Sequence, residues 1–184
     1  RKPVRLDDVS DLVREQLFDV DLEGNDLNVW LYNTARLAIS FGHVGVLVDA
    51  PKEGDKTRPY WVTYTPKDIL GFRSEIIDGI RQLTQLRLLE QVVEPDGKYG
   101  DKVIKQIRVL ERGRYEIHRK DDKKNEYKLF DEGEMSLKDK IPFAIAYSNR
   151  VGYYESRSPL YDIAELNLKH YQIQSDLDNI LHIS

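Results

Sequence analysis

The stretch RPYWVTYTPKDILGF, residues 58–72, places Tyr60, Trp61 and Tyr64 between two prolines. Side chains alternate between the two faces of a strand, so Tyr60 and Tyr64 share one face and Trp61 lies on the other. Aromatic side chains divided in this way do not converge on one ligand pocket. The pattern therefore predicts a strand that packs against a separate layer on each face.

The residues after this strand predict a rigid corner. Thr65 is expected to cap a single helical turn, because Pro66 occupies the first helical position and Asp68 the third. Gly71 is expected to close that turn, and Phe72 to begin the next strand. The stretch would then join two strands of a scaffold.

Helices are expected before it. Apolar residues at helical spacing predict a helix over residues 6–18. A second helix should follow, with Asn25 or Asp26 as its N-cap and Gly42 as the residue that ends it. The apolar run at residues 45–50 then predicts a buried strand.

The central part predicts an antiparallel meander. Between residue 72 and about residue 148, apolar and polar residues alternate over short runs. The expected turns are Asp78-Gly79, Pro95-Asp96-Gly97, Arg112-Gly113, residues 121–124 and Asp131–Gly133. IPFAIAY, residues 141–147, is expected to be the last strand of the meander.

The predicted fold class is therefore α+β, with N-terminal helices, a central and mostly antiparallel β meander and a long C-terminal helix. We expect a single domain over residues 1–184, comprising a helical part (1–42), a β-rich part (43–150) and the start of a long helix (159–184). The chain opens with Arg1 and closes within a helical pattern, which suggests a piece of a longer polypeptide.

Composition excludes several classes of function. The 184 residues include no cysteine, which rules out thiol catalysis, disulfides and cysteine-based metal sites. The net charge of -4 argues against a protein whose main role is to bind phosphate groups. No apolar run approaches the roughly 20 residues of a membrane helix, so no membrane partner is expected.

Metal sites find little support. Asp19, Asp21 and Glu23 imitate the start of a calcium-binding loop, but its twelfth position, which requires glutamate, is Trp30. The histidines are not spaced as zinc ligands; they are His43, His118, His170 and His182. We expect neither a metal nor a cofactor.

No catalytic motif is present either. The chain lacks a GxSxG nucleophile motif and the glycine-rich phosphate loops. Ser158, before Pro159, predicts the cap of the last helix. Asp49, at the end of a predicted strand, is the best catalytic candidate, but we assign no catalytic residue and expect no enzyme.

Residues 98–128 are locally basic, with eleven Lys and Arg against six Asp and Glu. One interpretation is a contact with nucleic acid or another acidic surface. The candidate contacts are Lys102, Lys105, Arg108, Arg112 and Arg114. The favoured interpretation is a solvated face of the meander, on which lysines discourage edge pairing.

The last helix is apolar over most of its circumference. Its polar strip is Glu165, Lys169, Gln172, Asp176 and Asn179. One apolar face comprises Leu160, Ala164, Leu168 and Tyr171, and the other Leu166, Ile173, Leu177 and Ile180. Such a helix packs on several sides. It is either a central core helix or a helix that also meets a neighbouring subunit or further chain, and the second face is the candidate interface.

Three segments together resemble the phage and prophage family related to tailed-phage portal proteins. They are RPYWVTYTPKDILGFR, IPFAIAY and SPLYDIAELNLKHYQIQSDLDNILH. DVDLEGNDL, followed by a helix and GVLVDAP, is similar to the N-terminal section of that family. The similar segments occur in the same order and together extend over most of the chain. The resemblance implies no catalytic residue.

The resemblance implies a ring, usually of about twelve subunits, at one vertex of the capsid. The implied partners are terminase, capsid or scaffold proteins, head-completion proteins and the double-stranded DNA that passes through the channel. The implied location is the portal vertex of the virion, and the bacterial cytoplasm during assembly. This chain would supply the wing-like N-terminal part and the start of a helix near the channel.

Two other classes of function stay open. One is a metal-dependent phage nuclease or hydrolase that uses Asp49 with nearby carboxylates. The other is an adaptor that binds nucleic acid or protein through residues 98–128.

Overall fold

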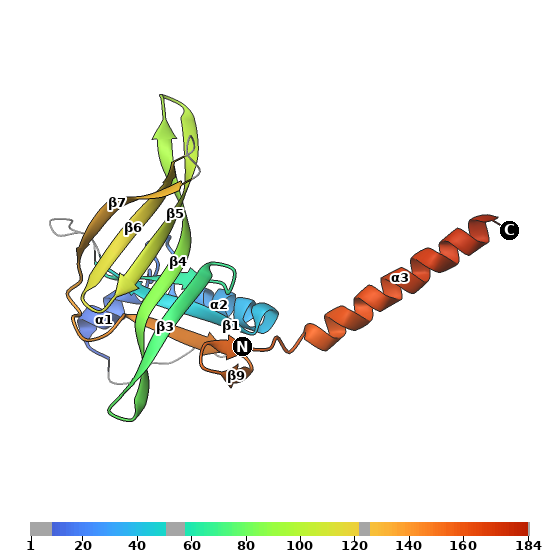
Figure 1. Ribbon diagram of the computed structural model, residues 1–184, viewed down its shortest axis with the longest axis horizontal. Helices are drawn as coiled ribbons and strands as arrows, with labels where there is room; N and C mark the ends of the chain where they lie inside the picture. The colour runs from blue at the N-terminus through green and yellow to red at the C-terminus, as the bar shows by residue number, and fades with distance from the viewer. Residues whose placement is uncertain (1–8, 51–57, 122–125, 184) are drawn as a thin grey trace.

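The computed structural model describes residues 9–50, 58–121 and 126–183 (Figure 1). These form an α+β fold, as predicted. The helices are α1 (Asp11–Gln16), α2 (Leu27–Phe41) and α3 (Tyr161–Ile183). The strands are β1 (His43–Asp49), β2 (Tyr60–Tyr64), β3 (Ile69–Ile77), β4 (Ile80–Asp96), β5 (Gly100–Glu111), β6 (Arg114–Asp121), β7 (Glu126–Glu134), β8 (Phe143–Tyr147), β9 (Arg150–Gly152) and β10 (Glu155–Ser156).

Local sequence signals set the limits of α2. The Asp26 side chain accepts a hydrogen bond of 2.9 Å from the backbone N–H of Val29, which satisfies a donor at the helix start. Gly42 ends the helix with a φ of 92°, a conformation that favours glycine. Both ends are as predicted.

The first helix is shorter than predicted over its described part. α1 begins at Asp11, and Val9 and Ser10 are not helical; residues 6–8 lie outside the described ranges. The chain then turns back, because the N–H of Leu27 donates to the carbonyl of Leu17 at 2.9 Å. This tertiary contact replaces the last helical turn that periodicity suggested.

The strands form two main sheets rather than one meander. One has the order β2-β1-β8, and the other follows the chain as β3-β4-β5-β6-β7. IPFAIAY is therefore not the last strand of the meander, because β8 pairs with β1. The Phe143 ring lies over Gly45, where an added Cβ would come within 2.1 Å of it. A glycine on β1 thus makes room for the aromatic ring of β8.

The described body has three layers. Leu47 of β1 packs with Leu86, Leu88 and Leu110 between the two sheets. On the other face of the first sheet, the Trp61 ring contacts the Trp30 ring of α2, with centroids 4.9 Å apart. Strand β2 therefore packs on two layers, as its alternating aromatics predicted.

Two predicted turns differ in the structure. Asp68 does accept hydrogen bonds from the N–H and hydroxyl of Thr65, at 3.1 and 2.6 Å. However, Gly71 does not close that turn, because β3 already begins at Ile69. The turn expected at Asp131–Gly133 is also wrong. β7 continues through it, with a register irregularity opposite Ile117 that absorbs an extra residue as a bulge.

The long helix α3 projects from the body (Figure 1). Residues 161–182 are exposed, so, of the two alternatives for this helix, the central core helix is wrong. α3 begins at Tyr161 and not at Pro159, so the prediction that Ser158 directly caps this helix is wrong. The Ser158 hydroxyl accepts from the N–H of Leu160 at 3.1 Å and donates to the carbonyl of Ile39 at 2.9 Å. The start of α3 is thereby tied to the end of α2. None of the described helices is both long and apolar enough to span a membrane.

Candidate functional site

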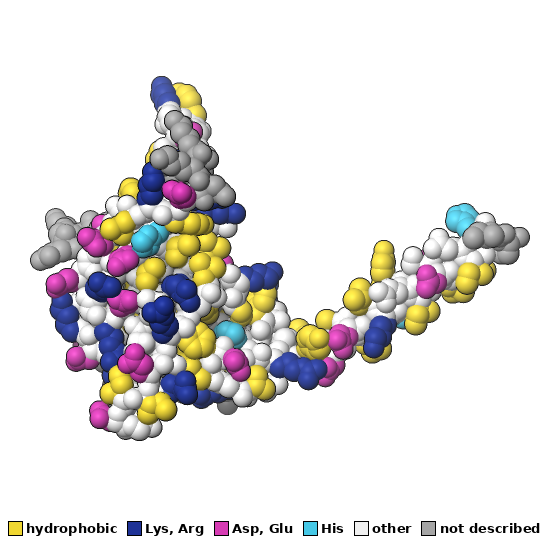
Figure 2. Space-filling model, viewed as in Figure 1, with side chains coloured by type: hydrophobic (Ala, Val, Ile, Leu, Met, Phe, Trp, Pro, Cys, Tyr) yellow, Lys and Arg dark blue, Asp and Glu magenta, His cyan; other side chains and the backbone are white. Residues whose placement is uncertain are grey.

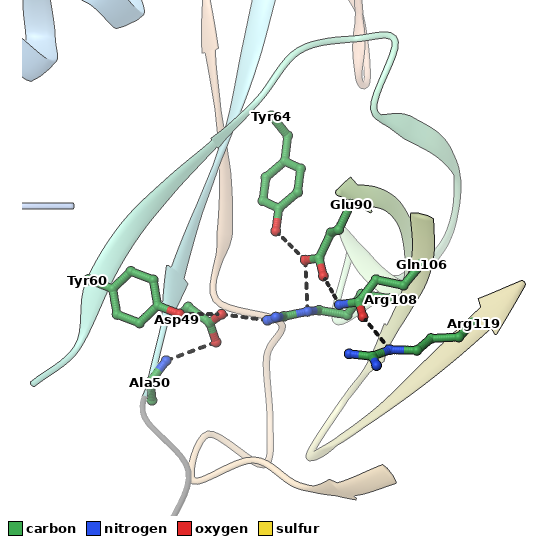
Figure 3. A network of polar contacts seen from close by, with 8 residues as sticks. All are labelled: Asp49, Ala50, Tyr60, Tyr64, Glu90, Gln106, Arg108 and Arg119. Atoms are coloured by element: carbon green, nitrogen blue, oxygen red, sulfur yellow. Dashed lines mark hydrogen bonds and ion pairs between the residues drawn. The ribbon is translucent and has the colours of Figure 1, made fainter. Parts of the chain in front are cut away.

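A connected group of polar side chains lies between the two sheets (Figure 3). Arg108 of β5 places Nη1 2.6 Å from Oδ2 of Asp49, at the end of β1, and Nε 2.9 Å from Oε1 of Glu90 on β4. These side chains are 19%, 18% and 11% exposed, respectively. One largely buried guanidinium therefore bridges carboxylates from both sheets. We call Asp49, Glu90 and Arg108 the inter-sheet clamp.

Neighbouring groups complete the clamp. The hydroxyl of Tyr64 donates to Oε1 of Glu90 at 2.6 Å, and that of Tyr60 donates to Oδ2 of Asp49 at 3.3 Å. Nε2 of Gln106 donates to Oε2 of Glu90 at 2.8 Å. Burial raises the pKa of Tyr64 above its usual value, and the charge of Glu90 raises it further.

The clamp holds its charges in place. Burial alone would lower the pKa of Arg108, but Glu90 and Asp49 outweigh it and hold that pKa above its ordinary value. Asp49, the catalytic candidate, is occupied by Arg108 and Tyr60. Within the described ranges, no three His, Asp or Glu side chains gather closely enough to hold a metal ion. This arrangement joins the two sheets through Arg108.

The acidic turn before α2 also uses its carboxylates internally. Oδ1 of Asp21 accepts from the N–H of Glu23 at 3.0 Å, and Oδ1 of Asp19 accepts from the N–H of Gly24 at 2.9 Å. Asp19 also pairs with Arg58, 3.2 Å away. These bonds shape the connection between α1 and α2.

The structure does not bring the four histidines together. Nδ1 of His43 lies 2.6 Å from the hydroxyl of Ser156, and burial lowers the pKa of this imidazole. His118 lies on β6 of the five-stranded sheet, where its Nε2 is 3.0 Å from Oε2 of Glu116 on the same strand. His170 and His182 are exposed on α3.

The candidate basic residues lie on different surfaces. Arg108 is in the clamp, and Arg112 donates to Gln82 at 3.1 Å. Arg114 binds Glu111 at 2.6 Å on the outer face of the five-stranded sheet. Lys102 and Lys105 stand opposite Glu94 and Gln91 on the ribbon formed by the ends of β4 and β5, on opposite faces of it. They do not form one basic surface.

The candidate interface on α3 is accessible. Leu166 and Ile173 are each 68% exposed, Leu177 is 48% exposed and Ile180 is 65% exposed. The opposite apolar face is exposed as well, with Tyr171 at 71%. Figure 2 shows hydrophobic side chains along both sides of this helix.

Sequence reasoning found Asp49 and Arg108 but missed that they meet, and it missed Glu90 and Gln106. A signal was present, because Glu90 continues the buried alternation of Leu86 and Leu88 on β4. A charged side chain on the strand face that otherwise carries buried apolar residues requires a partner there.

No model of a known protein family matches the chain, and no curated protein is significantly similar to it. In the structure itself, the largely buried charges of the clamp join the two sheets, and the apolar faces of α3 lie exposed.

Proposed function

We propose that this chain is a structural subunit of a homo-oligomeric ring, of the kind that tailed-phage portal proteins form, and that it has no catalytic activity. The observation that carries the proposal is α3, which has 23 residues and exposes two apolar faces. A helix with this surface calls for partners beyond the body of its own chain.

The placement of the two faces favours a ring over a pair. At about 100° per residue, Leu166 and Leu168 lie roughly 160° apart around the helix, and so do the two faces that they represent. A two-fold dimer would use one self-complementary face, whereas a closed ring gives each helix two different contacts. In a closed ring of about twelve parallel helices, the two contact directions differ by about 150°, which is close to this separation.

Assembly would stabilise α3 itself. Full burial of a leucine or isoleucine side chain contributes about 1.5–3 kcal/mol, and each face carries several large apolar residues. Isolated helices are marginal in water and depend on packing of their apolar face. A neighbouring copy would supply that packing on each side.

The remaining functional assignments follow from the portal class. The ring would sit at one capsid vertex, and in the bacterial cytoplasm during assembly. It would bind terminase, capsid or scaffold proteins and head-completion proteins while double-stranded DNA passes through. The net charge of -4 suits a channel that lets DNA slide rather than holding it.

The direct test is the mass of the assembled protein, measured by mass photometry and negative-stain electron microscopy. We expect closed rings of about a dozen copies. Leu166→Lys with Ile173→Lys should abolish rings, as should Leu168→Lys with Tyr171→Lys. Gln172→Lys, on the polar strip, is the matched control and should leave the rings intact.

Mixing the two double variants separates a ring from other assemblies. Each variant keeps one intact face, so one copy of each can join through a single intact contact and then stop. We therefore expect heterodimers and no rings from the mixture. A wild-type chain that is strictly monomeric, or that forms only two-fold dimers, would overturn the proposal.

A further inference from the structure

The outer face of the five-stranded sheet carries two cross-strand rows that end in opposite charges at its two edges. The first row, from β3 to β7, is Arg73, Gln85, Glu111, Arg114 and Glu134. The second is Gly71, Arg87, Val109, Glu116 and Glu132. Arginine thus lies near the β3 edge in both rows, and glutamate lies on β7.

The charges inside the first row are satisfied. Glu111 accepts from Gln85 at 2.8 Å and from Arg114 at 2.6 Å. At the row ends, within the described part of the chain, Arg73, Arg87 and Glu132 are exposed and have no ion pair at contact distance. The charge of Arg73 acts on Glu111, and that of Glu132 acts on Arg114, only from further away. Figure 2 shows basic and acidic side chains interspersed over this face.

Gly71 lets the second arginine reach the β3 edge. An added Cβ at Gly71 would lie 2.6 Å from Nη2 of Arg87, so the guanidinium lies over the backbone of β3. A larger residue at position 71 would occupy that path. The β3 edge therefore presents two guanidinium groups, one from its own strand and one from β4.

The β7 edge borders a surface hollow of about 490 Å³, whose carboxylates complement the arginines of the β3 edge. Its wall includes the carboxylates of Glu116, Glu132 and Glu134. The basic side chains in the same wall are already engaged: Arg112 with Gln82, Arg114 with Glu111 and Glu116, and Lys138 with Glu134. Among the described residues Glu132 has no such contact, and Glu134 is 83% exposed despite its pair with Lys138, so both carboxylates can accept a further cation.

We propose that, in the assembled protein, the β3 edge of one copy lies against the β7 edge of the next copy. Arg73 of one copy then faces Glu134 of the next, and Arg87 faces Glu132. In the described chain no other strand pairs with the outer edge of β3 or β7. The partner is a second copy because the two complementary edges belong to the same sheet.

The geometry allows both ion pairs. β3 and β7 run in the same direction in the sheet, so copies placed side by side would meet as parallel strands about 4.8 Å apart. β4 of one copy would then lie about 9.6 Å from β7 of the next, within the combined reach of an arginine and a glutamate. The contact is heterologous and can close a ring. The inference rests on the proposed ring and adds a contact beyond α3.

Disulfide trapping tests the contact, since the chain has no cysteine of its own. Neighbouring strands place facing Cα atoms within the range of a disulfide. We expect Arg73→Cys with Glu134→Cys to give a ladder of covalent multimers on a non-reducing denaturing gel. Neither single cysteine variant should give a ladder. The control pair Arg73→Cys with Asp101→Cys, whose second residue lies on the ribbon, should give none either.

Charge reversal provides a second measurement. Arg73→Glu alone, or Glu134→Arg alone, should raise the concentration needed for half-assembly by at least about tenfold, because like charges would face each other. The double variant should recover most of that loss. If the wild type forms rings but the cysteine pair gives no ladder and the charge variants show no shift, the edge contact is wrong. The proposed function would then still stand. A strictly monomeric wild type would overturn both.

Discussion

Replacing Arg108 with methionine tests whether the inter-sheet clamp holds the two sheets together. Methionine keeps much of the side-chain length but removes the charge that faces Asp49 and Glu90. Both carboxylates lie less than a fifth exposed, so they would stay buried without their cation. We expect Arg108→Met to be the most destabilising charge-removing substitution in the body.

The magnitude follows from that burial. Removing one partner of a buried ion pair costs about 3–5 kcal/mol. Domains unfold with a total of about 5–15 kcal/mol, so this cost is a large share. For a chain of this size, about 2–4 °C of melting temperature is lost per kcal/mol, which gives a decrease of roughly 6–20 °C.

Thermal and urea unfolding would be followed by tryptophan fluorescence, because Trp30 and Trp61 contact each other in the core. Arg114→Met, which removes an exposed arginine that also binds two glutamates, is the control and should barely move the midpoint. Adding Asp49→Asn and Glu90→Gln to Arg108→Met should restore much of the stability, because no buried charge is then left alone. A single variant as stable as wild type, or a triple variant weaker than the single, would refute the reasoning.

Three further predictions concern single positions. Folding raises the pKa of Tyr64, so the neutral phenol stabilises the folded state. This contribution to the free energy of unfolding is complete below the unfolded-state pKa of about 10 and is lost as the pH rises above that value. Tyr64→Phe should therefore flatten the alkaline fall in urea midpoint; an unchanged slope would contradict this. Asp26→Ala removes the N-cap of α2 and should cost about 1 kcal/mol in urea unfolding; no loss would show that the cap is dispensable. Gly45→Ala places a Cβ within 2.1 Å of the Phe143 ring and should cost about 1–3 kcal/mol. An unchanged melting temperature would mean that β8 can shift freely.

Local patterns predicted the parts of the fold that local forces decide. Asp26 and Gly42 set the ends of α2 because a cap and a left-handed residue act on their immediate neighbours. The alternation of Tyr60, Trp61 and Tyr64 predicted two packed faces because a strand has a period of two. Asp68 binds Thr65, three residues before it, as the corner motif required.

The candidate sites were less predictable, because each depends on contacts between distant segments. Nothing within a few residues of Arg108 shows that Asp49, 59 positions away, will be its partner. The same holds for β8, whose apolar alternation suits either sheet and whose pairing with β1 depends on space above Gly45.

The apolar pattern of α3 was evident from the sequence, but its surroundings were not. Leu166, Ile173 and Leu177 would show the same spacing in a core helix as in a helix that packs on another copy. Periodicity reports which side chains must leave water and not which surface will cover them. The sequence by itself thus determined the helix and its two faces. Only the tertiary structure showed that the body of the chain leaves both faces exposed, because its two sheets and α2 already complete their own core.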